Sequence, residues 1–286
     1  MSRCFAATGL LLATLAVAGC APLTLYNSFV PSDVGVEVAR SDIAYGPLPR
    51  QRLDVYVPAA RKSPVPVVVI FYGGSWNSGS KEQYAFLGKA IASRGFVAIV
   101  ADYRLVPEVR FPAFLEDGAL AIVWAHRKAK DFGGDPDKLY LLGHSAGAYN
   151  AVMIALDGRY LTAAGASPTL IRGVAALAGP YDFKLDVAST RAAFGRAPDY
   201  AATQPVNFVT REAPALFLAT GNDDTTVQPR NTEALAEKMR RAGRPVTVRR
   251  YAGIGHVGIL LALSKPLRAQ APVLDDVARF FADEQK

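Results

Sequence analysis

Ser145 is the residue of this 286-residue chain whose setting best suits chemistry. It stands between Gly143 and Gly147, after a short apolar run and before a segment of helical composition. A serine at a sharp turn from strand to helix is typical of an exposed nucleophile. The two glycines would let strand and helix approach closely, and the free N–H of Ala146 could stabilise an anion. The alternative is an incidental serine in a glycine-flanked turn.

A serine nucleophile needs a base to remove its proton, and the chain has three histidines. His144 adjoins Ser145, where its side chain is expected to point away from the hydroxyl. His126 lies in a predicted helix beside two basic residues and is expected to face solvent. This leaves His256, in a glycine-rich loop after the last predicted strand. The alternative for His256 is a histidine that only packs within its loop.

An imidazole base needs a carboxylate that fixes its tautomer and stabilises its charged form. Asp223 and Asp224 follow a predicted strand over residues 215–220, and only one of them can face His256. Two aspartates after the preceding strand are weaker candidates: Asp182 and Asp186. Asp102 and Asp117 are expected to be structural, paired with local backbone or with Arg104.

Two glycines, Gly73 and Gly74, follow an apolar run over residues 65–71, with Tyr72 between the run and the glycines. Glycines at this point permit a backbone that turns its N–H groups towards open space, as stabilisation of an oxyanion requires. The alternative is a flexible glycine turn without chemistry.

Apolar runs and helical segments alternate along most of the chain, which predicts a doubly wound, mostly parallel sheet flanked by helices. Strands are expected at residues 53–57, 65–71, 96–102, from 139, 173–178, 215–220 and 246–251. Helices are expected at residues 112–130, 146–156, 230–242 and 273–282. Ligands of such sheets bind beyond the carboxyl ends of the strands, where the residues discussed above would meet.

Residues 181–211 form a longer segment that carries several aromatic residues among prolines and glycines. We interpret it as an excursion over the site that contributes an apolar pocket. The alternative is a loop that packs at the periphery.

The N-terminus has the pattern of a targeting segment, with Arg3 before an apolar stretch over residues 5–18. That stretch is shorter than the roughly 20 residues that a transmembrane helix needs. It ends at Cys20 and resembles a bacterial lipoprotein signal, which implies that Cys20 is acylated and becomes the mature N-terminus. Ala21 in the next position resembles lipoproteins sorted to the outer membrane. The alternatives are an ordinary secretory signal and an uncleaved anchor.

These patterns divide the chain into a signal over residues 1–19, a tether over residues 20–46 that leads into the domain, and one domain over residues 47–286. Cys4 and Cys20 are the only cysteines. After cleavage the chain could form no internal disulfide, and a cysteine nucleophile and a cysteine-ligated metal site are excluded.

The span from about residue 65 to 281 resembles the α/β-hydrolase superfamily, in its esterase/lipase branch that also holds formamidase-like enzymes. The matching motifs are Tyr72-Gly73-Gly74-Ser75-Trp76, Asp102-Tyr103-Arg104, Gly143-His144-Ser145-Ala146-Gly147, Gly221-Asn222-Asp223-Asp224 and Gly255-His256.

The resemblance favours Asp224 over Asp223, because the acid of the family stands three residues after the glycine, here Gly221. It also implies that three N–H groups form the oxyanion hole: those of Gly74, Ser75 and Ala146. Two departures from the family pattern affect this loop. Tyr72 replaces the usual histidine, and Ser75 replaces the third glycine.

The implied activity is two-step acyl transfer by Ser145, His256 and Asp224, without metal or organic cofactor. Small carboxylic esters are the expected substrates. An arylformamide such as formylkynurenine is an alternative suggested by the glycine-tryptophan motif Gly74-Ser75-Trp76. A catalytically silent, lipid-anchored binding module is a third possibility.

The formal net charge is +7, and basic residues gather in one region: Lys238, Arg240, Arg241, Arg244, Arg249 and Arg250. A solvated helix face is the expected reading, with a face near anionic lipid headgroups as the alternative. Without a basic stripe interleaved with aromatic residues, nucleic acid is not an expected partner.

Overall fold

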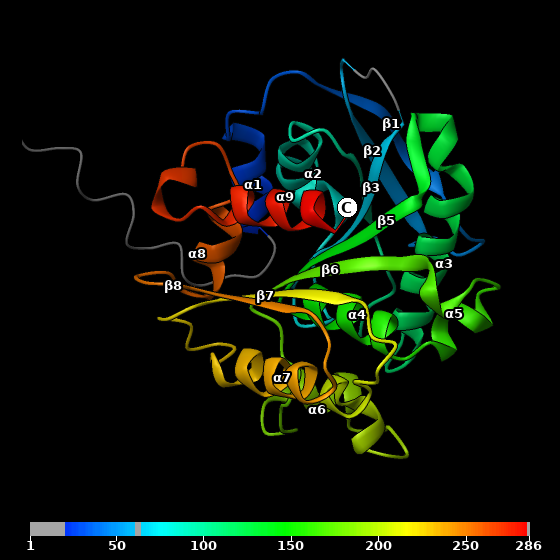
Figure 1. Ribbon diagram of the computed structural model, residues 1–286, viewed down its shortest axis with the longest axis vertical. Coiled ribbons are helices and arrows are strands. Elements are labelled where there is room, and N and C mark those ends of the chain that lie inside the picture. The colour runs from blue at the N-terminus through cyan, green and yellow to red at the C-terminus, as the bar shows by residue number, and fades with distance from the viewer. Residues whose placement is uncertain (1–20, 61–63, 285–286) are drawn as a thin grey trace, which may run out of the picture.

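The computed structural model describes residues 21–60 and 64–284. The expected signal and Cys20 lie outside these residues. The described strands form one eight-stranded sheet in the order β1-β2-β4-β3-β5-β6-β7-β8 (Figure 1). Their bounds are β1 Val36–Ala44, β2 Arg52–Pro58, β3 Val65–Phe71, β4 Val97–Ala101, β5 Gly134–His144, β6 Ile171–Leu177, β7 Ala215–Gly221 and β8 Val246–Tyr251.

Helices cover both faces of this sheet, α2 and α9 on one and α3, α4 and α7 on the other (Figure 1). The α-helices of the described residues are α1 Ala21–Phe29, α2 Ala85–Ala92, α3 Ala113–Lys128, α4 Ala146–Leu156, α5 Arg159–Ala163, α6 Ala188–Phe194, α7 Arg230–Arg241, α8 His256–Leu261 and α9 Val273–Asp283.

The sheet is parallel from β4 to β8, whereas β1 and β2 pair antiparallel with their neighbours. This confirms the expected doubly wound, mostly parallel sheet. The run over Val65–Phe71 forms β3 and is buried almost throughout, as a β-branched strand covered by helices on both faces should be. The carboxyl ends of β3, β5, β7 and β8 therefore meet at one edge.

The N-terminal segment differs from the expected tether. Its described part forms α1 and the edge strand β1, and it packs against the end of the chain. The Tyr26 hydroxyl lies 2.6 Å from Ser264 Oγ, and the Arg268 guanidinium donates to both Asp33 oxygens at 2.9 and 3.0 Å. Sequence periodicity missed β1 because most of its residues are exposed, so it carries no apolar alternation.

We expect Asp33→Ala to lower the free energy of unfolding by about 1–3 kcal/mol, because it leaves the largely buried Arg268 without its carboxylate. Chemical denaturation measures this loss. Asp131→Ala is the matched control, since its ion pair with Lys128 is exposed and should contribute less than about 0.5 kcal/mol. Equal effects of the two substitutions would show that residues 21–35 are not an integral part of the domain.

Candidate active site

Ser145 occupies a strained turn between β5 and α4. Its backbone has φ 55° and ψ −122°, a combination that residues other than glycine rarely adopt. A Cβ atom on Gly143 would lie 2.3 Å from the Gly147 carbonyl oxygen, and one on Gly147 would lie 2.1 Å from that of Phe71. Both glycines are therefore required by close approach of strand and helix, as the sequence predicts.

His256 links the serine to an aspartate. Its Nε2 lies 2.8 Å from Ser145 Oγ, and its Nδ1 lies 2.8 Å from Asp224 Oδ2. Asp224 is buried in the turn after β7, where its Oδ1 accepts the N–H groups of Thr226 and Val227. With Nδ1 donating to the carboxylate, Nε2 is free to accept the serine proton. This arrangement can activate Ser145 as a nucleophile.

The other carboxylates proposed from the sequence lie elsewhere. Asp223 is exposed, and so are Asp182 and Asp186. Asp117 is buried and forms an ion pair with Arg104 at 2.8 Å, as expected. His256 itself is the first residue of α8 and not part of a loop.

His144 points away from the serine hydroxyl and connects three segments. Its Nε2 donates to the His256 carbonyl oxygen at 3.0 Å, and its Nδ1 accepts from the Tyr84 hydroxyl at 2.9 Å. That hydroxyl accepts the Gly73 N–H at 3.0 Å. Burial and the nearby His256 lower the pKa of His144 to about 3. A neutral His144 thus joins the nucleophile strand to the base and to the glycine loop.

His126 is less exposed than expected. It is half-buried on α3, and its Nδ1 lies 3.1 Å from the Pro136 carbonyl oxygen. Pro136 lies near the amino end of β5, whereas Ser145 follows the carboxyl end of this strand, so His126 is remote from Ser145.

The glycine loop after β3 passes directly over the nucleophile. A Cβ atom on Gly73 would lie 3.0 Å from Ser145 Cβ. Gly74 has φ +124° and Ser75 has φ 53°, and the Gly74 carbonyl oxygen accepts the N–H groups of residues 77 and 78. Among the described residues, the N–H groups of Gly74, Ser75 and Ala146, which surround Ser145, form no hydrogen bond. They are available to an anion over the serine.

Trp76 anchors the glycine loop to α4. It is buried, and its Nε1 donates to Asn150 Oδ1 on α4 at 3.0 Å. Phe183 and Phe194 pack against its ring, with centroid separations of 6.4 and 4.7 Å. These two aromatic residues belong to the segment expected to form the substrate pocket, and instead they support the loop that carries the free N–H groups.

A cavity of about 220 Å³ lies above Ser145. Its polar side comes from the glycine loop, Ser145 and His256. Its apolar side comes from Leu23 on α1 and from Val257 and Leu260 on α8. No residue of 181–211 lines this cavity, so the expected contribution of that segment is not found there. The apolar wall comes from α1 and α8, neither of which is expected from the sequence pattern.

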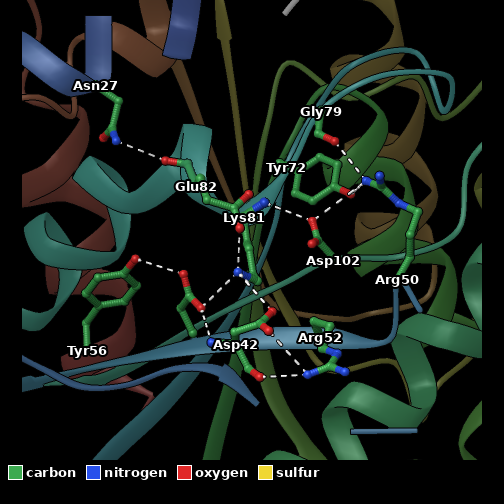
Figure 2. Close-up of polar contacts among 11 residues, drawn as sticks. Asn27, Asp42, Arg50, Arg52, Tyr56, Tyr72, Gly79, Lys81, Glu82 and Asp102 are labelled. Atoms are coloured by element: carbon green, nitrogen blue, oxygen red, sulfur yellow. Dashed lines mark hydrogen bonds and ion pairs between the residues drawn. The ribbon is translucent and has the colours of Figure 1, made fainter. Parts of the chain in front are cut away.

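Tyr72, which replaces the family's usual histidine, takes part in a polar network at the far end of the loop (Figure 2). Arg50 Nη2 donates to the Tyr72 hydroxyl and to the Gly79 carbonyl oxygen, both at 2.8 Å. The Tyr72 ring stacks on Tyr103 with centroids 4.5 Å apart. Arg50 thereby links Tyr72, which precedes the loop over residues 73–79, to Gly79 at its other end.

Lys81, at the start of the 3₁₀ helix Lys81–Tyr84, continues this network towards the antiparallel edge of the sheet (Figure 2). Its Nζ lies 3.1 Å from Asp54 Oδ1 and also pairs with Glu82, while its N–H donates to Asp102 Oδ1 at 2.8 Å. Burial alone would lower the pKa of Lys81, but hydrogen bonds to Glu82 and Asp54 raise it above its usual value. The charged Lys81 thereby ties the loop to β2.

Within residues 21–60 and 64–284, no group of three or more His, Cys, Asp or Glu side chains is arranged to hold a metal ion. None of the helices in the same residues combines the length and apolar character needed to cross a membrane.

The chain matches one family model and is similar to several proteins named as esterases. A family model described as BD-FAE matches residues 53–239. The probable isoprenylcysteine alpha-carbonyl methylesterase ICME of Oryza sativa subsp. japonica is 29% identical over 253 residues, 81% of this chain and 60% of its own length. Esterase LipC of Mycobacterium tuberculosis is 30% identical over 244 residues, 77% of this chain and 60% of its own length. This chain thus spans about 60% of the length of both relatives.

Among solved structures, esterase B from Lactobacillus rhamnosis superposes with a TM-score of 0.80 at 19% identity, covering 92% of this chain and 90% of that one. At this identity the likeness shows a shared fold.

Asp102 provides a test of the network that holds the loop. Burial raises the pKa of Asp102 to about 6, despite the Lys81 N–H and the nearby Arg50. Between the unfolded and folded pKa values the folded state holds more protons, so stability falls as pH rises. Relative to Asp102→Asn, which does not titrate, the wild-type free energy of unfolding should fall by about 2 kcal/mol between about pH 4 and pH 7. Denaturant unfolding at a series of pH values measures the difference, and parallel profiles would contradict the assignment.

Proposed function

Because this chain belongs to the BD-FAE family, we propose that it is a serine hydrolase of carboxylic esters. Its fold is the α/β-hydrolase fold, with an eight-stranded, mostly parallel sheet in the described residues. The observation that carries the proposal is the continuous hydrogen-bond chain from Ser145 Oγ through the His256 ring to Asp224. The esterase names of its relatives support the same reaction class.

In the proposed reaction, His256 Nε2 takes the proton of Ser145 as Oγ attacks the ester carbonyl carbon. Asp224 holds the imidazole and stabilises its charged form. The oxyanion is received by the N–H groups of Gly74, Ser75 and Ala146. His256 then gives its proton to the leaving alcohol, and a water molecule activated in the same way hydrolyses the acyl-enzyme.

Losing Asp224 should be far more costly than losing its neighbour. We expect Asp224→Asn to lower kcat/KM on p-nitrophenyl acetate by at least about 1,000-fold, because the imidazole loses its orienting carboxylate. Asp223→Asn is the matched control: it is exposed and should stay within about twofold of wild type. A fluorophosphonate probe should label the wild type but not Ser145→Ala.

Two results would overturn this assignment. Folded wild-type protein that forms no fluorophosphonate adduct on Ser145 would indicate a silent binding module. A rate on an arylformamide that dominates the rates on all esters would indicate an amide hydrolase.

We also propose that the chain is an exported lipoprotein, anchored through Cys20 on the periplasmic side of the bacterial outer membrane. The support is the N-terminal pattern and Ala21 after the cysteine. Because α1 begins at Ala21, the anchor would lie immediately beside the domain and not at the end of a long tether.

In cells, radiolabelled palmitate should be incorporated into the wild-type chain and lost in Cys20→Ala, because acylation requires the cysteine sulfur. Cys4→Ala is the matched control, since Cys4 lies within the cleaved signal and its loss should leave labelling unchanged. Labelling that persists in Cys20→Ala would refute the anchor.

A further inference from the structure

A second apolar cavity, of about 440 Å³, lies between α1 and α8. Leu25 and Phe29 line it from α1, and Leu261 and Pro266 line it from α8 and the turn that follows. We call it the α1–α8 groove. Its volume lies within the roughly 300–1,000 Å³ range of pockets that bind small ligands. Within the part of the chain that the structure describes, no segment fills it.

The groove adjoins the cavity above Ser145. Leu23 and Val257 line both of them. Val257 also follows His256 directly, so the side wall of the groove and the proposed base belong to the same turn of α8. Leu23 and Val257 are therefore the side chains that stand between the cavity above Ser145 and the groove.

We propose that the α1–α8 groove binds an aliphatic chain of the ester whose carbonyl group is attacked by Ser145. This inference rests on the proposed esterase function and names its substrate class: esters with an extended aliphatic chain in place of only small esters. Leu23, Phe29 and Val257 act as specificity-determining residues. They touch the chain and not the reacting atoms.

The exposure of the lining residues supports a ligand that binds reversibly. Leu25 is 58% exposed, Phe29 77% and Val257 51%. Exposed apolar side chains that line a groove gain free energy only when an apolar surface covers them. An aliphatic chain joined to the ester covers them at the moment when its carbonyl lies over Ser145.

Chain length is the first measurement. Each methylene that enters the groove should raise kcat/KM by about three- to fourfold, the factor expected for its full burial. Two series separate the ends of the ester, alkyl acetates and methyl alkanoates, each used as dissolved monomers with the full-length chain. We expect kcat/KM to rise with chain length in one of the two series.

The second measurement uses a matched pair of variants. Phe29→Asn places an amide in the groove at a highly exposed position, so folding should be unaffected. It should lower kcat/KM for the longest ester of the preferred series by about tenfold and leave ethyl acetate within about twofold of wild type. Val34→Asn is the control: Val34 is 81% exposed, lies just beyond α1 and does not line the groove. It should change neither rate.

The outcomes separate this inference from the function on which it rests. Without turnover of any ester and without a fluorophosphonate adduct on Ser145, the esterase function fails, and the groove assignment fails with it. Turnover with flat profiles in both series overturns the groove assignment alone. So does a Phe29→Asn variant that keeps the wild-type profile but binds phosphatidylglycerol vesicles more weakly, because the groove is then a membrane contact.

Discussion

The site depends on one constraint, the near-contact of backbone between β3, β5 and α4 at the turn that carries Ser145. The strained dihedral angles of Ser145 cost free energy, and such strain persists only where surrounding structure determines it. Here the Ser145 N–H donates to the Leu177 carbonyl oxygen on β6, and the Ser145 carbonyl oxygen accepts from Tyr149 on α4. Larger residues at positions 143 and 147 would separate these elements, and the hydroxyl would no longer point at His256.

The buried side chain of His144 connects this turn to the rest of the site. His144 is the last residue of β5, directly before Ser145, so the same backbone fixes the position of its ring. Its two nitrogens reach the His256 carbonyl oxygen and, through Tyr84, the Gly73 N–H. The lowered pKa keeps the ring neutral, with one donor and one acceptor, which is what this pair of hydrogen bonds requires. The His144 side chain thus fixes the positions of His256, Ser145 and the glycine loop relative to one another.

Short apolar runs reveal where the parallel strands end, and this placed Ser145, His256 and the pair Asp223 and Asp224 at one edge of the sheet. The choice of Asp224 over Asp223 came from the family resemblance and not from the strand pattern. The supporting network was not predictable in the same way. Arg50, Lys81 and Tyr84 come from polar or irregular segments, where no hydrophobic period indicates position. Helix α8 was missed because it has only six residues and follows glycines, and the edge strand β1 was missed because it is largely exposed.

The apolar wall of the cavity rests on the part of the fold with the weakest local preference for its structure. Helix α1 has nine residues, too few to be stable alone in water, so its position depends on tertiary contacts. Leu23 and Val30 pack against the core, while Tyr26 and Asp33 make the polar ties to Ser264 and Arg268. A change in these ties would move Leu23, the α1 part of the wall, whereas Val257 and Leu260 share α8 with His256. The α1 side of the cavity is therefore held by interactions separate from those that hold Ser145, His256 and Asp224, whereas the α8 side is fixed together with His256.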